Sequence, residues 1–333
     1  LPVQRGELAP DALGVAAPDP RTVVFTLERS AAMEQLLTLP IAFPVDLRGV
    51  AEHGAEHTRP GRLVGNGAYR LQAWRPQAQV TVVRNPHFRE AAPIPEVRFH
   101  VTEDAASELQ RFAAGGLHIT ETLPPQPLAG LRARFGEQLR IAPYLGSFWL
   151  GLNLTRPPLG GCADGDTDCA ARRLALREAL SLAVDRGILV RHVTGFGEAQ
   201  AHGLVPPGIA GHVPVSLPWA GLDREARLAL ARQRFAEAGY GPDRPLQLEL
   251  RYNTSTPHRR MALAVASMWR EHLGVRVRLR NEEWRVYVRN RRQRAITEVF
   301  RGGWIADVDD ARNFLALFQG GTDNVLNWSG FDD

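Results

Sequence analysis

The strongest constraint on the fold of this chain is a hydrophobic period that changes repeatedly between residues 223 and 301. In some segments apolar and polar side chains alternate, as expected for a strand with one buried face, and in others they recur every three to four residues, as in an amphipathic helix. The pattern predicts, in order, a helix at 224–238, a strand at 246–251, a helix at 257–273, a strand at 275–280, a helix at 284–292 and a strand at 296–301. Strands joined by helices in this order predict a largely parallel sheet with right-handed crossovers.

The rest of the chain mixes the two kinds of element. An apolar helix face at 176–184 precedes the regular region. Shorter patterns predict strands and helical patches at 20–28, 32–37, 79–84, 96–101 and 105–114. The chain is therefore expected to be of the α/β class.

Length and charge narrow the function classes. The 333 residues are enough for about two domains. All 40 basic residues are arginines and they exceed the 36 acidic residues by four, so a net charge of +4 gives no electrostatic case for nucleic acid as a partner.

No stretch approaches 18 consecutive apolar residues, so we expect no membrane-spanning helix. The chain begins with Leu and ends without a terminating element, which favours a fragment of a longer protein.

Two cysteines, Cys162 and Cys169, lie in a loop rich in glycine and aspartate. They are close enough in sequence to close a small disulfide ring, and two cysteines without a neighbouring histidine do not make a closed zinc site. Asp164, Asp166 and Asp168 have the spacing that begins a calcium loop, but the glycine and the glutamate that complete such a loop are missing. We therefore expect a Cys162–Cys169 disulfide, formed in an oxidising compartment, and no metal.

Two loops are candidates for a ligand site, because ligands of parallel α/β sheets bind beyond the carboxyl ends of the strands. These loops are residues 252–255 and 302–307. Taken singly, the charged residues beside them are explained as solvated strand ends or turn formers. Together they offer a guanidinium, an indole, a carboxylate and an imidazole around one crevice, which suits a zwitterion because buried charges must be paired. The residues are Arg301, Trp304, Asp307 and His258.

No enzyme signature is present in the sequence. The chain lacks G-x-S-x-G, H-E-x-x-H, a Walker loop and C-x-x-C. Gly65-Asn66-Gly67 and Gly195-Phe196-Gly197 are too short for a dinucleotide fingerprint and are explained as turns. The ten histidines show no metal-ligand spacing on a helix. The absence of these motifs indicates no cofactor, but it does not exclude catalysis, because acid and base residues can lie far apart in the sequence.

Several short blocks, in a consistent order and spacing, give the chain a resemblance to a known family. The blocks lie at 66–69 with Trp74, 84–86, 180–186, 236–240, 252–255, 273–275 and 303–307. On these blocks the sequence resembles the extracytoplasmic solute-binding proteins of family 5, the oligopeptide-binding proteins of ABC importers, from about residue 10 to the last residue. The resemblance implies a two-lobed periplasmic-binding-protein fold of type II. It places residues 1–145 in an incomplete first lobe and residues 146–333 in an incomplete second lobe.

The resemblance also implies roles for individual side chains. Asp307 would hold the α-ammonium group of a peptide, and Arg301 and His258 would hold peptide carboxylates. The expected ligand-binding set is completed by a second basic residue, two pocket aromatics and two residues of the Tyr-Asn-Thr-Ser block, namely Arg291, Trp304, Trp284, Asn253 and Thr254.

The function implied by the resemblance is that of a periplasmic peptide-binding component of an ABC importer. Such a protein captures short peptides between two lobes by hinge closure and delivers them to permease subunits in the membrane. We expect a monomer whose partners are peptides and the permease.

Two departures from the family pattern are visible. A lysine that close oligopeptide-binding relatives carry is absent near Thr194, which puts recognition of the longest peptides in doubt. A disulfide of those relatives joins positions that are Gly146 and Ile305 here.

Other readings of the sequence remain open. Family relatives bind nickel chelates, haem or murein peptides, so the ligand could be one of these. The same fold also serves as the ligand-sensing domain of cytoplasmic transcriptional regulators, although a disulfide would be improbable in the cytoplasm. A hydrolytic enzyme is the third alternative.

Overall fold

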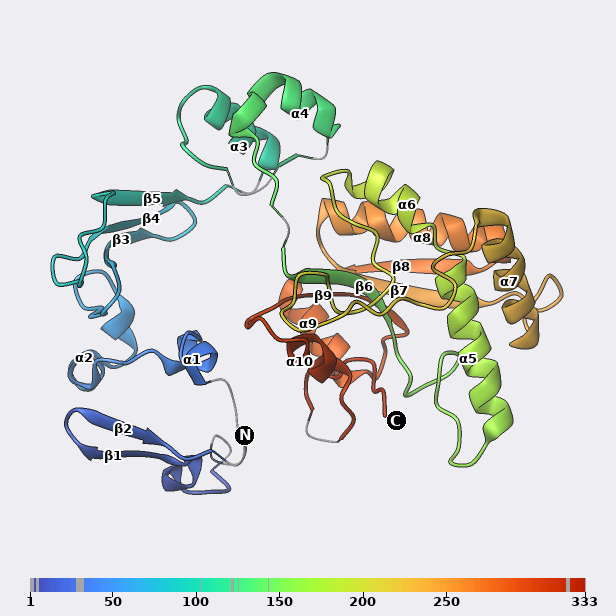
Figure 1. Ribbon diagram of the computed structural model, residues 1–333, viewed down its shortest axis with the longest axis horizontal. Coiled ribbons are helices and arrows are strands. Elements are labelled where there is room, and N and C mark those ends of the chain that lie inside the picture. Colours follow the sequence, from blue (N-terminus) through green and yellow to red (C-terminus); the bar gives the residue numbers. More distant parts are fainter. Residues whose placement is uncertain are drawn as a thin grey trace. The chain divides into compact units, whose positions relative to one another are not determined.

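The computed structural model describes residues 3, 6–27, 33–102, 104–120, 123–124, 126–142, 144–321 and 324–332. The chain divides into two compact units, residues 1–103 and 104–333 (Figure 1). This division lies before the lobe boundary predicted at 145/146, and the assignment of residues to lobes stays a prediction.

The first unit is built from short elements. Strands β1 (Val15–Asp19) and β2 (Thr22–Phe25) form an antiparallel hairpin, and a second antiparallel sheet has the order β3-β4-β5. The strands of this sheet are β3 (Tyr69–Arg75), β4 (Gln79–Arg84) and β5 (Glu96–His100). The helical segments are η1 (Pro10–Leu13), α1 (Met33–Leu36), η2 (Pro40–Ala42), α2 (Leu47–His53) and η3 (Gly54–Thr58).

The sequence patterns of the first unit are largely confirmed. Both strands predicted at 79–84 and 96–101 are present as β4 and β5. The strand predicted at 20–28 is shorter, because residues 20 and 21 form the turn that joins β2 to β1. Residue 28 and residue 32 of the predicted helical patch lie outside the described residues.

The second unit contains a four-stranded sheet with the order β6-β9-β7-β8. Its strands are β6 (Gly146–Leu152), β7 (Gln247–Asn253), β8 (Arg276–Glu282) and β9 (Val299–Ile305). Strand β7 runs parallel to both β8 and β9, whereas β6 runs antiparallel to β9. The predicted parallel β-α-β arrangement is therefore confirmed, with one antiparallel strand added at the edge.

The helices of the second unit begin and end near the residues that the sequence indicates. Asp223 caps α7 by accepting a hydrogen bond from Ala226 N at 2.8 Å, and Gly274 ends α8 with a positive φ of 70°. The longer helices are α3 (Ala105–Ala113), α4 (Leu128–Phe135), α5 (Thr167–Leu182), α7 (Arg224–Glu237), α8 (Thr256–Leu273) and α9 (Trp284–Gln293). The shorter segments are η4 (Gly136–Gln138), α6 (Arg186–Ile188), the π-helix η5 (Leu189–Thr194), α10 (Arg312–Leu315) and η6 (Ala316–Phe318).

The main hydrophobic core lies between one face of the sheet and helices α5, α7 and α8. Leu248, Leu250 and Tyr252 of β7 point into it, since alternate side chains of a strand share a face. They meet apolar residues of the helices, among them Leu176, Leu180, Phe235, Val265 and Trp269. The indole of Trp269 also donates a hydrogen bond to Leu180 O at 2.8 Å, which ties α8 to α5.

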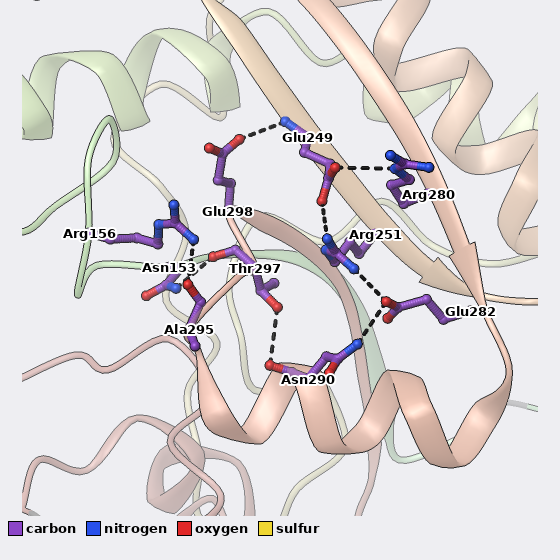
Figure 2. A network of polar contacts seen from close by, with 10 residues as sticks. All are labelled: Asn153, Arg156, Glu249, Arg251, Arg280, Glu282, Asn290, Ala295, Thr297 and Glu298. Carbon is purple, nitrogen blue, oxygen red and sulfur yellow. Dashed lines mark hydrogen bonds and ion pairs between the residues drawn. The ribbon is translucent and has the colours of Figure 1, made fainter.

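The opposite face of the sheet is polar and is covered by α9 (Figure 2). Arg251 of β7 forms ion pairs with Glu249, at 2.5 Å, and with Glu282 at the end of β8. Asn290 of α9 donates to the same Glu282 carboxylate at 2.8 Å, and Arg280 approaches Glu249 at 3.3 Å. These mostly buried carboxylates are thus each held by an arginine of the sheet.

Strand β9 differs from its prediction at both ends. It begins at Val299 rather than at 296, because the carbonyls of Arg294 and Thr297 accept hydrogen bonds from the buried Asn153 side chain. These bonds hold residues 294–297 as a loop, and Figure 2 shows the one between Asn153 and Thr297.

At its other end β9 runs on to Ile305, so most of the predicted loop 302–307 is strand. A Cβ at Gly302 would lie 2.4 Å from the Trp149 indole nitrogen, so this glycine makes room for a ring on β6. Strand β6 is not predicted by the sequence patterns, and it begins at Gly146, where the second lobe is expected to begin.

The predicted disulfide is present. Cys162 and Cys169 are bonded, with 5.8 Å between their Cα atoms, and Asp166 between them caps α5 by accepting from Cys169 N at 2.9 Å. Among the described residues no helix is both long and apolar enough to cross a membrane.

Candidate ligand-binding site

Three of the predicted residues meet where β7 and β9 lie side by side. Asn253 ends β7, and His258 lies in the first turn of α8, which follows at once. Arg301 lies in the middle of β9 rather than at its end. Because β7 and β9 are parallel neighbours, these segments come together at the same edge of the sheet.

Phe148 of β6 contacts both basic groups. The guanidinium carbon of Arg301 lies 5.1 Å from the centre of the Phe148 ring, within the range of a cation–π interaction. The centre of the His258 ring lies 5.9 Å from the same ring centre, with 31° between the planes. Phe148 is 40% exposed, so this ring supports the two basic side chains without closing them off from solvent.

Of the two basic residues Arg301 and His258, only Arg301 is charged at neutral pH, and its charge is not paired within the described residues. Burial lowers the pKa of the Arg301 guanidinium, and burial with the charge of Arg301 lowers the pKa of His258 to about 4. Arg301 Nε and His258 Nδ1 are buried, and neither makes a hydrogen bond with any residue that the structure describes. In the described part of the chain no carboxylate lies within 4.0 Å of Arg301. A ligand carboxylate would supply the missing charge.

Arg291, the second predicted basic residue, is buried in aromatic surroundings. Its side chain is 6% exposed, and its guanidinium carbon lies 3.5 Å from the centre of the Trp328 ring and 5.3 Å from that of Tyr287. Burial lowers the pKa of Arg291 to about 10. The Tyr287 hydroxyl donates to the backbone oxygen of Arg301, and burial raises the pKa of Tyr287 to about 12. Tyr287 thus links the two basic residues.

The nearby acidic residues do not neutralise these arginines. Glu249 and Glu282 pair with Arg251, and Glu249 also pairs with Arg280 (Figure 2). Like Arg301, Arg291 has no carboxylate within 4.0 Å among the residues that the structure describes. The carboxylates of the polar face therefore leave the positive charges of Arg301 and Arg291 unneutralised.

Asp307 lies beyond the end of β9 with its side chain exposed. Its backbone N–H donates to Asn313 Oδ1 at 3.1 Å. The same oxygen accepts from the Trp304 indole at 2.7 Å, and Trp304 packs against Trp328 with 6.2 Å between ring centres. The side-chain amide of Asn313 thus connects Asp307 and Trp304 through two hydrogen bonds.

The remaining predicted residues lie at the same end of the sheet. Thr254 is exposed, and its N–H donates to Glu282 O at 2.8 Å. Asn253 Oδ1 is buried, and it accepts no hydrogen bond from the residues that the structure describes. Trp284 is 51% exposed and lies 6.2 Å from Tyr287, measured between ring centres. The ligand roles of all eight residues stay predictions.

Four residues of this region were missed by the sequence reasoning. Phe148 and Trp328 come from segments distant from the predicted loops, and their aromatic identity alone does not distinguish a site from a core. Tyr287 follows Trp284 by one helical turn on α9, a spacing that could have indicated a shared face. Asn313 lies on the short helix α10, which has no hydrophobic period to find.

Positions 146 and 305 face each other directly in the β6–β9 ladder. The resemblance implies a disulfide at these positions in close relatives, and directly opposed strand residues lie near enough for such a bond. A Cβ on Gly146 would lie 3.3 Å from the Ile305 side chain. The register thus agrees with the positions at which the resemblance places that disulfide.

No metal centre is evident in the described ranges. Within them, no group of three or more His, Cys, Asp or Glu side chains could hold a metal ion.

Comparison with known proteins gives a consistent assignment. A model of the bacterial extracellular solute-binding proteins, family 5, middle part, matches residues 3–325. The periplasmic murein peptide-binding protein MppA of Escherichia coli is 35% identical over 315 residues, which are 94% of this chain and 56% of that protein. The periplasmic oligopeptide-binding protein OppA of Salmonella typhimurium is 32% identical over 307 residues, 91% of this chain and 54% of that protein.

Solved structures agree with these sequence matches. The E. coli murein tripeptide-binding protein MppA superposes with a TM-score of 0.84 at 33% identity, covering 100% of this chain and 63% of that one. OppA of Haemophilus influenzae bound to the peptide RPPGFSPFR superposes with a TM-score of 0.81 at 28% identity, covering 99% of this chain and 63% of that one. The chain spans about half the length of the curated relatives it matches. It belongs to the bacterial extracellular solute-binding proteins of family 5.

Proposed function

We propose that this protein is the peptide-binding component of an ABC importer and acts outside the cytoplasm. It captures short peptides by closure of two lobes and passes them to membrane permease subunits, and it performs no catalysis. Membership of family 5 supports this proposal, as do the peptide-binding names of its relatives.

The observation that carries the proposal is the unpaired charge at the edge of the sheet. Within the described residues, Arg301 has no carboxylate within 4.0 Å, and Nδ1 of the neutral His258 is buried and makes no hydrogen bond. Asp307, at the end of the same strand, presents an exposed carboxylate. A peptide carries both an ammonium and a carboxylate, so it would satisfy both kinds of group.

Calorimetric titration tests this function. The protein is titrated with tripeptides and tetrapeptides of varied side chains, and with single amino acids as controls. We expect most of the peptides to bind with similar affinity, because pocket water adapts to different side chains. If no peptide bound, the proposed function would be wrong.

A murein peptide is a second candidate ligand. The observation that favours it is the 35% identity to the murein peptide-binding protein, compared with 32% to an oligopeptide-binding protein. A murein tripeptide and an ordinary tripeptide are titrated side by side. Tighter binding of the murein tripeptide by tenfold or more would assign it as the preferred ligand.

The cytoplasmic sensor left open by the sequence is not favoured. The Cys162–Cys169 bond suits an oxidising compartment, and the relatives named above are described as periplasmic. Detection of the protein in the periplasmic fraction, with the disulfide intact, is the expected result.

A further inference from the structure

One amide oxygen joins two groups that are expected to meet the ligand. Asn313 Oδ1 accepts a hydrogen bond from the Trp304 indole nitrogen at 2.7 Å and another from the Asp307 backbone nitrogen at 3.1 Å. Both partners are N–H donors, so only the oxygen end of the amide can serve both of them. The orientation of Asn313 is therefore set by its two contacts.

The helix that carries Asn313 is firmly anchored. Phe314, the next residue of α10, is completely buried and packs in a hydrophobic cluster with Val205 and Ile209. The backbone N–H of Asn313 donates to Asp310 O at 3.0 Å. A side chain on such a base can hold a neighbouring loop in one position.

The loop that carries Asp307 has further attachments on either side. Ala306 N donates to Leu145 O at 2.7 Å, and Ala210 N donates to the Asp309 carboxylate at 3.0 Å. Between these two points the backbone N–H of Asp307 is held by Asn313, while its carboxylate stays exposed. Asn313 is thus the contact nearest to the charged group itself.

We propose that Asn313 is a positioning residue that fixes the Asp307 carboxylate relative to the Trp304 ring, and thereby sets how strongly the protein recognises the free amino terminus of its ligand. This inference rests on the proposed peptide-binding function, in which Asp307 holds the ammonium group. Asn313 makes no contact with the ligand in this role. It keeps the ammonium partner and the aromatic wall at a fixed separation, so that a peptide can meet both at once.

Three variants test the role of the amide oxygen. Asn313→Leu keeps the size of the side chain but removes the acceptor. Asn313→Asp keeps an acceptor oxygen at the same place. Arg312→Ala is the matched control, because Arg312 is adjacent on α10, is exposed, and pairs with Asp310. Thermal unfolding checks that each variant folds, and Asn313→Ala replaces Asn313→Leu if the leucine is not tolerated.

The main readout is the ratio of two affinities, for a tripeptide with a free amino terminus and for the same peptide N-acetylated. We expect Asn313→Leu to reduce this ratio tenfold or more, while Asn313→Asp and Arg312→Ala leave it within about twofold of the parent. The indole N–H resonance of Trp304, assigned by a Trp304→Phe variant, should shift in Asn313→Leu only. A ratio unchanged in Asn313→Leu, or reduced equally by Arg312→Ala, overturns the proposal.

Asp307→Asn separates this inference from the proposed function. If Asp307→Asn abolishes the preference for a free amino terminus and Asn313→Leu does not, Asp307 binds the ammonium group but Asn313 does not position it. If neither the parent nor any variant distinguishes the two peptides, the role of Asp307 itself is wrong, and the inference falls with it.

Discussion

The guanidinium of Arg301 lies on the ring of Phe148, with 5.1 Å between the guanidinium carbon and the ring centre. An aromatic ring orients a cation without cancelling its charge, unlike a carboxylate. Arg301 is therefore fixed by the protein and yet remains available to an anionic ligand group. Its neighbour His258 contributes no charge at neutral pH, because its pKa is lowered to about 4.

Replacing Phe148 should weaken recognition of a ligand carboxylate. Phe148→Leu removes the ring that supports Arg301, whereas Phe148→Tyr keeps it. A cation–π contact of this kind contributes about 0.5–1 kcal/mol, so we expect a loss of roughly two- to fivefold in affinity for a peptide acid. The affinity for the corresponding C-terminal amide should change less. Calorimetry with both peptides checks this, and an equal loss for the two would show that Phe148 does not act through Arg301.

Ligand binding should take up protons at mildly acidic pH. The pKa of His258 in the free protein is about 4, and a ligand carboxylate placed beside it would raise that pKa by favouring the imidazolium. Between about pH 4 and 6 a peptide acid should therefore bind with uptake of a fraction of a proton. Titrations at pH 5 in buffers of different ionisation enthalpy measure this fraction. His258→Gln should abolish it and the exposed His192→Gln should not; uptake that persists in His258→Gln would contradict the assignment.

The same residue should make stability depend on pH. His258 titrates near pH 6.5 in the unfolded chain and near pH 4 in the folded one, so the unfolded state binds more protons between these values. The stabilisation due to a neutral His258 is complete above pH 6.5 and is lost as the pH falls toward 4. Urea unfolding at pH 7 and pH 4.5 should show a smaller pH dependence in His258→Gln than in the parent. An identical dependence in both would indicate an ordinary pKa.

The disulfide should stabilise the fold without affecting the ligand. Cys162 and Cys169 are separated by seven positions, and closing a loop of this size is worth about 2–3 kcal/mol in the chain-entropy account. Cys162→Ser with Cys169→Ser should lower the free energy of unfolding by about this amount. Peptide affinity should stay the same, because the bond lies at the start of α5 and the site is formed by β6, β7, β9 and α8. A loss of affinity in the folded variant would tie the loop to binding.

Sequence reasoning worked where a local period decides the structure. The elements β7, α8, β8 and α9 each have a regular apolar spacing, and they are present close to the predicted residues. The carboxyl-end rule adds His258 and Arg301, whose ligand roles stay predictions. Prediction from the sequence failed where a residue distant in the sequence determines the local structure. Gly302 lies in a strand that pairs with β6, and Trp149 of β6 fills the space above it. The sequence near position 302 does not indicate that ring.

The supporting residues of the site could not be found from the sequence for the same reason. Phe148 acquires its role only when β6 pairs antiparallel with β9, which puts it opposite Gly303. Asn313 acquires its role only because the chain turns after β9 and brings α10 back to Trp304. Such contacts depend on tertiary structure, and periodicity carries no information about them.

The proposed ligand site pairs Asp307 with the ammonium group of a peptide, and Arg301, with His258, with its carboxylate. The most direct test of this pairing compares one tripeptide in four forms, with each end either free or blocked by acetylation or amidation. We predict that blocking either end weakens binding to the parent protein at least tenfold, about 1.4 kcal/mol, and that the effect of the amide disappears in Arg301→Gln. Equal affinity for the free and the doubly blocked peptide would contradict the account.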